Sequence, residues 1–412
     1  MINVKSCGLI VEYNPFHNGH FYHQESSRQK TDADVTVAVM SSSFLQRGEP
    51  AIIDKFARTK AALNHHVDVV LELPFLYAVQ YADLFAHGAV SILNALEVDY
   101  VCFGSESGDI QAFKDRYTHF KEHEEQFQSL LQKNLKQGYS FPQASTEAYD
   151  AIGLRSKELD LGQPNNILGF SYVKAIQNLN SDIIPETIQR TKSGYHDETI
   201  EHDIASATSI RQEIVSTKQL TKKAEQALPK ETVKQLKSYQ QNSGNWHDWE
   251  LYFPYLQLIV QTKSEEELRE VHGMIEGLEY KLKQTVNRVS NFQQWMEQLK
   301  TKRYTWTRLQ RIFVHLLTNT TKDEVEAYKD LTEPPYIRLL GMNEQGRAFI
   351  NQKKKQIDIP IISNLQQTQH PLIKIEERAT DAYYSVIQPH HRANLRKQEL
   401  TGPIMIKQSN AP

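Results

Sequence analysis

The order of apolar and polar positions divides the chain into an alternating first part and a helical second part. Short runs of branched apolar residues predict buried parallel strands, and segments with apolar positions three or four apart predict helices. Strands are expected at residues 4–11, 35–40, 67–73, 100–103 and 182–189, and helices at 21–29, 55–64, 84–96 and 170–179. This order predicts an α/β fold with a doubly wound parallel sheet in strand order 3-2-1-4-5.

After about Gly244 the pattern changes to polar helices without strand-like runs. Residues 265–299 carry Leu268, Val271 and Ile275 at helical spacing, which predicts one long helix. We therefore expect a catalytic domain over residues 1–220 and a mainly α-helical domain over residues 221–412.

Composition narrows the class of protein. The chain has 412 residues, a formal net charge of -3 and only two cysteines, Cys7 and Cys102, which excludes a disulfide scaffold and a cysteine-rich zinc site. The two thiols are expected on neighbouring strands, buried. No apolar run is long enough to span a bilayer, and no cationic leader precedes the first strand. These features predict a cytoplasmic protein without a membrane segment.

The stretch after the first expected strand carries the strongest chemical signal. Residues 8–11 run into Asn14-Pro15, as a strand runs into a turn, and a helix is expected to follow. Backbone N–H groups at a helix start attract phosphate, an effect worth roughly 0.3 to 1 kcal/mol. His17 and His20 share a helical face, from which ring N–H groups can contact phosphoryl oxygens, and Gly19 permits close approach. Taken alone, His-x-Gly-His also fits two histidines near an ordinary turn.

A second hydroxyl-rich stretch, residues 205–211, again opens a predicted helix. Ser206 and Thr208 with their N–H groups suit β- and γ-phosphates, and Arg211 can neutralise the charge that develops on pyrophosphate. A plain Ser/Thr N-cap is the alternative for this stretch alone. Its place after the first motif favours phosphate binding, so the pair predicts nucleotidyl transfer.

Cations and aromatic residues gather at residues 300–311. Phosphates can bind the cations here, and Tyr304 or Trp306 can stack on an unpaired base. A solvated helix start is the alternative. Candidate RNA contacts are Lys302, Arg303, Arg308 and Arg311.

Together these stretches resemble known families. The two phosphate motifs are similar to the signatures of the HIGH-motif nucleotidyltransferase superfamily. Longer stretches resemble the bacterial tRNA(Met) cytidine acetate ligases within it. These stretches are Glu12 to His20, Gln46 to Ala51, Asp54-Lys55, Asp68 to Pro74, Pro164 to Gly169 and Gly194-Tyr195-His196.

The resemblance implies a Rossmann-like nucleotidyltransferase domain, followed by a mainly α-helical C-terminal region that binds tRNA. It implies an ATP-dependent ligase that forms N4-acetylcytidine at the wobble position of elongator tRNA(Met). Acetate would attack the α-phosphate of ATP and release pyrophosphate. The cytidine amine would then attack the acetyl carbonyl of acetyl-adenylate and release AMP.

The two histidines are expected to be catalytic as electrostatic stabilisers, since acetate is already ionised and needs no base. Arg47, Lys55 and Arg58 are weaker candidates for steering acetate or tRNA. Mg²⁺ is expected with the triphosphate, yet no acidic cage or other set of metal ligands is visible. From the motifs and the resemblance, ATP contacts are expected at Ile10, Val11, Glu12, Tyr13, Asn14, Pro15, Phe16, His17, Asn18, Gly19, His20, Phe21, Tyr22, His23, Gly104, Asn165, Arg190, Ser206, Thr208 and Arg211.

Two other functions stay open at this point. One is a nucleotidyltransferase that makes a small-molecule cofactor, against which the large helical half argues. The other is a non-catalytic RNA-binding protein that senses ATP, which would bind both ligands without ever releasing pyrophosphate.

Overall fold

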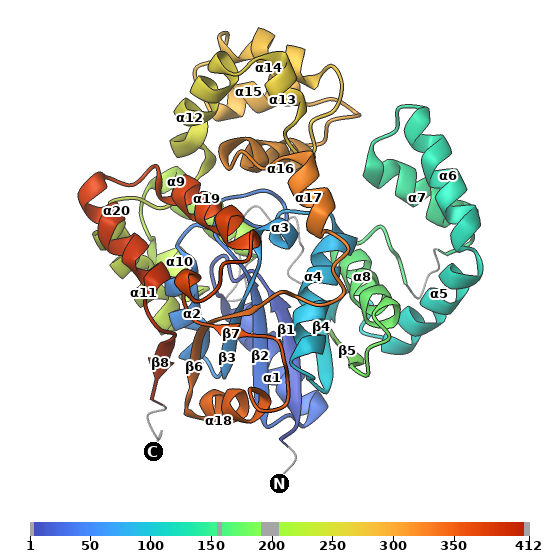
Figure 1. The fold of residues 1–412 in the computed structure, drawn as a ribbon, viewed down its shortest axis with the longest axis vertical. Coiled ribbons are helices and arrows are strands. Elements are labelled where there is room, and N and C mark those ends of the chain that lie inside the picture. Colours follow the sequence, from blue (N-terminus) through green and yellow to red (C-terminus); the bar gives the residue numbers. More distant parts are fainter. Residues whose placement is uncertain (1–3, 155–158, 191–205, 408–412) are drawn as a thin grey trace.

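A mostly parallel sheet forms the centre of the chain (Figure 1). The computed structural model describes residues 4–154, 159–190 and 206–407. The strand order is β5-β4-β1-β2-β3-β6-β7, and β8 also pairs with β6. The strands are β1 Ser6–Val11, β2 Val35–Ser41, β3 Val69–Leu73, β4 Tyr100–Ser105, β5 Ile184–Gln189, β6 Ile337–Asn343, β7 Ile361–Ile362 and β8 Ile404–Ile406.

The five N-terminal strands confirm the predicted parallel order 3-2-1-4-5. Strands β2 and β3 are buried along their whole length, which explains their continuous apolar runs. Cys7 and Cys102 are buried thiols on the neighbouring strands β1 and β4, as expected.

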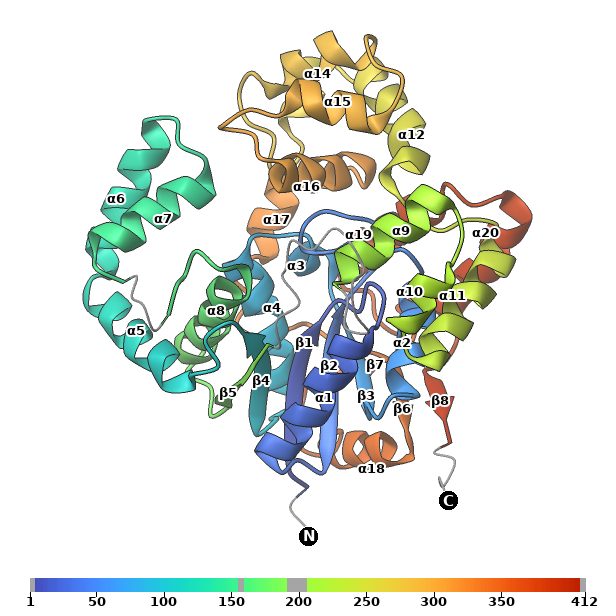
Figure 2. The ribbon, with the colours of Figure 1, turned by 180° about the vertical axis from the view of Figure 1, so that it is seen from behind.

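Helices cover both faces of this sheet. Helix α1 lies on one face, while α4 and α8 lie on the other (Figures 1 and 2). A Cβ at Gly8 in β1 would meet Leu93 Cδ1 of α4 at 2.7 Å, so the glycine lets the helix pack closely. The helices up to α11 are α1 Asn18–Thr31, α2 Lys55–Leu63, α3 Phe75–Ala78, α4 Ala82–Ala95, α5 Ile110–Glu122, α6 Glu124–Lys136, α7 Phe141–Ala151, α8 Pro164–Asn178, α9 Ala207–Thr217, α10 Lys222–Gln226 and α11 Lys230–Ser243.

Helices α5, α6 and α7 form an arm beside the sheet (Figure 1). The chain between α5 and α6 bends at His123, where the first helix ends and the second begins. Phe120, Phe127 and Tyr149 join the three helices through ring contacts. The arm therefore has an apolar interior of its own.

The C-terminal half is mainly helical but also supplies strands, which the sequence pattern did not reveal. Strand β6 pairs antiparallel with β3, and β7 and β8 pair with β6. The prediction of a mainly α-helical C-terminal region is confirmed, while strands β6, β7 and β8 were not predicted. The proposed division at residue 220 stays a prediction. The remaining helices are α12 Trp249–Thr262, α13 Glu265–Arg269, α14 Leu278–Val286, α15 Phe292–Leu299, α16 Trp306–Leu317, α17 Lys322–Tyr328, α18 Glu344–Lys353, α19 Leu372–Tyr384 and α20 Pro389–Arg396, with short 3-10 turns at Leu365–Gln367 and Lys397–Leu400.

A buried ion network joins the two halves. Lys55 Nζ of α2 contacts Glu72 Oε1 at 2.6 Å and Glu399 Oε1 at 2.9 Å. Arg338 of β6 contacts both carboxylates from the other side, with Nη1 at 2.7 Å from Glu72 Oε2. The four side chains are 1–3% exposed, so each charge depends on its partners.

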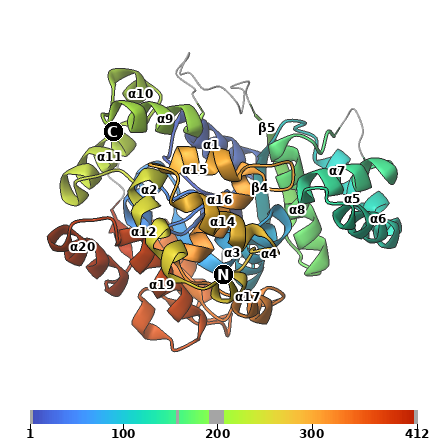
Figure 3. The ribbon, with the colours of Figure 1, turned by 90° about the horizontal axis from the view of Figure 1, so that it is seen from above.

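Helices α12 to α17 form a cap above the carboxyl ends of the strands (Figures 1 and 3). The single helix predicted over residues 265–299 is wrong, since the segment forms three short helices. Gly273 and Gly277, with φ of +80° and +90°, interrupt it because this backbone conformation ends a right-handed helix. None of the helices in the described ranges has the length and hydropathy that crossing a bilayer requires.

Candidate functional site

A cavity of about 920 Å³ lies at the carboxyl ends of β1, β4 and β5. The first residues of α1, α8 and α9 reach it from the sheet side. The arm lines it through Phe127, Leu131, Phe141 and Tyr149, and the cap lines it through the start of α16. Ligands of open α/β sheets bind at this edge, next to a change in strand order.

The start of α1 is built by the two predicted histidines. His17 is the N-cap, and its Nδ1 accepts the backbone N–H of Gly19 at 3.0 Å. The His17 backbone N–H in turn donates to Nδ1 of His20 at 3.3 Å. This capping box uses imidazoles where helices commonly use Ser and Glu.

The capping box also sets where the imidazole protons lie. A ring nitrogen that accepts a hydrogen bond carries the lone pair, so the neutral rings of His17 and His20 hold their proton on Nε2. Burial, followed by the charges of Arg190 and Arg211, lowers the pKa of His17 to about 3. Burial, followed by His17 and Arg190, holds the pKa of His20 well below its ordinary value. Both rings are therefore neutral N–H donors at neutral pH.

Three polar side chains are held together where β4 and β5 end. Arg190 Nη1 donates to Asn165 Oδ1 at 3.4 Å, and Asn165 Nδ2 donates to Glu106 Oε1 at 2.6 Å. A Cβ at Gly104 would meet Arg190 Cγ at 3.3 Å, so the absence of a side chain there gives the arginine room. Glu106 thus fixes Asn165, and Arg190 lies against both Asn165 and Gly104.

The start of α9 supplies the second predicted phosphate site. Ser206 is its N-cap, with Oγ accepting the Ser209 backbone N–H at 3.1 Å. Arg211 Nη1 donates to the carbonyl of Asn14 at 2.9 Å, and its Nη2 lies 2.6 Å from Glu49 Oε2. The guanidinium of the second motif is thereby tied to the backbone of the first.

Most of the residues expected to bind ATP line this one cavity. The structure brings together Ile10, Val11, Glu12, His17, Gly19, His20, Tyr22, His23, Gly104, Asn165, Arg190, Ser206, Thr208 and Arg211. Pieces of sequence almost two hundred residues apart therefore face one space. Gly194-Tyr195-His196 and Ala205 lie outside the described residues.

The other residues expected to bind ATP do not line the cavity. They pack or form hydrogen bonds around the His17 motif instead. Tyr13 and Phe16 are buried core residues, and Pro15 lies between them. Asn14 Oδ1 accepts the Ile52 backbone N–H at 2.8 Å. Asn18 donates its backbone N–H to the carbonyl of Ala227, and the ring of Phe21 contacts those of His65 and His66.

The cation cluster predicted for RNA divides into different environments. Arg311 lines the cavity and Arg308 is half-buried, whereas Lys302 and Arg303 are exposed before α16 begins. Tyr304 is only 8% exposed, so its ring is not free to stack on a base, whereas Trp306, the alternative candidate, is half-buried.

The weaker steering candidates also divide. Arg47 lines the cavity. The prediction for Lys55 and Arg58 is wrong because both are buried. Lys55 belongs to the ion network, and Arg58 donates to the carbonyls of Glu12, Ser41 and Ser42.

One group of possible metal ligands was not foreseen from the sequence. Among the described residues, His119, Glu122 and His123 of the arm place ligand atoms within 4.8 Å of one another. None of the three lines the cavity. His119 Nε2 already lies 2.6 Å from the Ile152 carbonyl, so this histidine joins α5 to the end of α7.

Two helix starts that present N–H, imidazole and guanidinium groups to one cavity define a nucleotidyl-transferring enzyme. The sequence profile of the HIGH Nucleotidyl Transferase family matches residues 4–399, so the chain belongs to this family.

Relatives of the chain carry a more specific name. It is 53% identical over 401 residues to the tRNA(Met) cytidine acetate ligase of Oceanobacillus iheyensis, covering 97% of this chain and 100% of that one. The Bacillus subtilis enzyme of the same name is 44% identical over 399 residues, covering 96% of each chain.

Solved structures agree with this assignment. Apo Thermotoga maritima TmcAL superposes with a TM-score of 0.90 at 33% identity, covering 98% of this chain and 100% of that chain. The same protein bound with alpha-thio ATP superposes with a TM-score of 0.88 at 32% identity, with the same coverage.

Proposed function

We propose that the chain is a tRNA(Met) cytidine acetate ligase, which forms N4-acetylcytidine at the wobble position of elongator tRNA(Met) from acetate and ATP. The observation that supports this function most directly is the cavity shared by the two phosphate motifs. The chain that forms it is 53% identical to such a ligase along its length. Because its substrate is tRNA, we propose the cytoplasm as its location.

In the first step, an acetate oxygen attacks the α-phosphorus of ATP, and the bond to the β-phosphate oxygen breaks. Acetyl-adenylate and pyrophosphate result, and negative charge moves onto the leaving group. His17, His20 and Arg211 line the cavity, so their ring N–H and guanidinium groups are the donors proposed to stabilise this developing charge. Donors placed in advance stabilise such a transition state.

In the second step, the cytidine N4 amine attacks the acetyl carbonyl, the bond to AMP breaks, and the amine loses a proton to water. The lowered pKa values of His17 and His20 favour their neutral state. They therefore serve as hydrogen-bond donors and not as imidazolium acids. Asn165 and Arg190, which are hydrogen-bonded to each other in the cavity lining, are proposed to hold the adenylate during this step. Lys302, Arg303, Arg308 and Arg311 are proposed to contact the tRNA.

Mg²⁺ is proposed to enter with the triphosphate, because the cavity's described carboxylates are already engaged. Glu49 is paired with Arg211 at 2.6 Å and Asp83 with Lys174 at 2.8 Å. Glu12 accepts a backbone N–H at 2.7 Å, and burial raises its pKa. Magnesium commonly keeps water and substrate phosphate oxygens as its ligands, which fits a site without an acidic cage.

The decisive experiment incubates the chain with ATP, labelled acetate and total tRNA, and then analyses the nucleosides. Labelled N4-acetylcytidine in elongator tRNA(Met) is the expected product. A cofactor-making nucleotidyltransferase would leave the tRNA unlabelled, and an ATP sensor would release no pyrophosphate.

His20→Ala separates catalysis from RNA binding. We expect it to abolish acetate-dependent pyrophosphate release and to leave tRNA binding largely unchanged. Normal pyrophosphate release by this variant would exclude the proposed role of the histidines.

A further inference from the structure

The wall that α16 contributes to the cavity contains an arginine that the nucleotide motifs do not explain. Arg311 lies in the second turn of α16 and lines the cavity together with Thr305 and Thr307. Its Nε is closed to solvent and meets no hydrogen-bond acceptor among the described residues. A guanidinium in such a place normally finds an anion or a carbonyl oxygen.

A second arginine reaches the same wall from the loop after β2. This loop is closed by hydrogen bonds from Leu45 N to Glu49 O at 2.9 Å and from Gly48 N to Leu45 O at 2.8 Å. Gly48 has a φ of +78°, and a Cβ there would collide with the backbone nitrogen of Arg311. Glycine thus lets the loop lie directly on α16 and places Arg47 beside Arg311 in the cavity lining.

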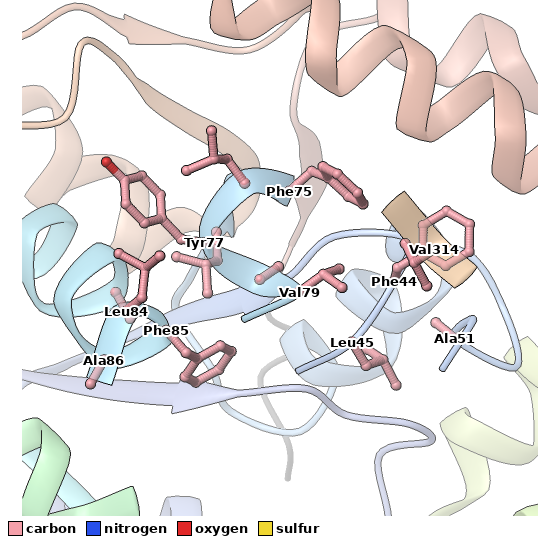
Figure 4. Packing of buried hydrophobic residues seen from close by; sticks show 14 of the residues in the cluster. Phe44, Leu45, Ala51, Phe75, Tyr77, Val79, Leu84, Phe85, Ala86 and Val314 are labelled. Carbon is pink, nitrogen blue, oxygen red and sulfur yellow. The ribbon is translucent and has the colours of Figure 1, made fainter. Parts of the chain in front are cut away.

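The loop is fixed from several sides, so this placement is rigid. Gln46 donates its backbone N–H to Glu12 at 2.7 Å and its side-chain Nε2 to the Gln80 carbonyl at 3.0 Å. Figure 4 shows Phe44 of the loop packed in the apolar cluster that includes Val314 of α16. The two arginines therefore come from elements that are locked together.

The charges around Arg311 are positive. Burial, followed by the charges of Arg308 and Arg47, lowers the pKa of Arg311 to about 10. The nearby carboxylate of Glu49 is engaged with Arg211. Guanidinium groups that converge beside a cavity repel one another, and an anion in the cavity relieves this repulsion.

We propose that Arg311 and Arg47, with Arg308 nearby, form an oxyanion site on the cap wall of the cavity. This site binds a substrate other than ATP. The proposal rests on the ligase function above and assigns ATP to the residues around His17, Arg190 and Arg211. A guanidinium group binds either a carboxylate or a phosphate through two parallel hydrogen bonds in the same planar geometry. The oxyanion is therefore either the acetate carboxylate or a phosphodiester next to the target cytidine.

The test measures KM for acetate, ATP and tRNA in Arg311→Gln and Arg47→Gln. Acetate-dependent pyrophosphate release without tRNA reports the first step, and labelled N4-acetylcytidine reports both. Arg288→Gln, which removes an exposed arginine of the cap away from the cavity, is the matched control.

Both cavity variants are expected to raise one KM about tenfold or more, as loss of a charged hydrogen bond does, and to leave KM for ATP within about twofold. A raised KM for acetate in pyrophosphate release identifies the carboxylate. A raised KM for tRNA with normal pyrophosphate release identifies the phosphodiester. If neither KM changes, or if KM for ATP alone rises, the oxyanion site is wrong.

A folding failure of one variant and an inactive wild type can each be told apart from failure of the oxyanion site. If Arg311→Gln does not fold, Arg47→Gln on the separate loop decides the question alone. A wild-type chain that releases no pyrophosphate with acetate would contradict the ligase function itself, which distinguishes that failure from failure of the oxyanion site.

Discussion

The ring of His20 stacks on the ring of His17 with centroids 3.8 Å apart, while its Nδ1 accepts the His17 backbone N–H. One pair of side chains therefore both caps α1 and carries the donors that face the cavity. His17 performs the two tasks through different atoms, since Nδ1 makes the cap and Nε2 holds the proton. The two tasks can be separated experimentally.

His17→Asn keeps the cap and removes the donor at the Nε2 position, which the shorter asparagine amide does not reach. Asparagine is among the preferred N-cap residues, and its Oδ1 can accept the Gly19 N–H. We expect acetate-dependent pyrophosphate release to fall about 10²- to 10³-fold, as it does when one transition-state donor is lost. The thermal midpoint should change little. His390→Asn, at an exposed histidine of α20, is the control, and a His17→Asn chain with normal turnover would show that the donor is dispensable.

The same variant tests the pKa of His17 through stability. In the folded chain this pKa is about 3, against 6.5 for an ordinary imidazole, so between these values the unfolded chain binds the additional proton. The free energy of unfolding therefore falls as pH drops from 6.5 towards 3. Compared with His17→Asn, the wild type should lose about 2 kcal/mol more between about pH 7.5 and about pH 5 in urea unfolding. Parallel loss in both chains would contradict the lowered pKa.

The N-terminal sheet was predictable because its central strands, such as β2 and β3, are buried on both faces and therefore read as apolar runs. Strand β6 did not stand out, since Arg338 interrupts it and its partner β3 lies more than two hundred residues away. Only the folded chain shows that Glu72 and Glu399 neutralise that arginine. A charge in a sequence ordinarily indicates a surface, and here it indicates a buried network.

The candidate site, like the sheet, could be predicted from the sequence only in part. His17 and Arg211 were predicted from local motifs, because a few consecutive residues are enough to indicate a helix start that binds phosphate. Glu49 lies in the stretch Gln46 to Ala51, which resembles the ligase family, but its pairing with Arg211 depends on the fold. The arm residues that line the cavity, such as Phe141, come from a polar segment without any phosphate motif. No local signal in the sequence marks them.

The buried ion network offers a test of how the two halves depend on each other. Glu399→Gln leaves Lys55 and Arg338 with one carboxylate fewer in a buried place, and breaking such a network costs about 3 to 5 kcal/mol. We expect this loss in urea unfolding, with the N-terminal sheet and the C-terminal strands unfolding together. Asp381→Asn, which breaks the half-exposed pair with Arg396, should cost less than about 1 kcal/mol. A second transition in Glu399→Gln would favour independent domains.

The exposed cations before α16 are expected to act on tRNA through charge alone. Lys302 and Arg303 lie at the surface, outside the cavity lining, so they can contact backbone phosphates without contacting ATP. In Lys302→Ala with Arg303→Ala, the slope of log affinity against log salt should flatten by about 1 to 2, because two phosphate contacts no longer release counterions. Acetate-dependent pyrophosphate release should be retained. Lys283→Ala with Arg288→Ala removes the same charge elsewhere on the cap and should leave the slope unchanged; equal slopes in both double variants would move the RNA contact away from this surface.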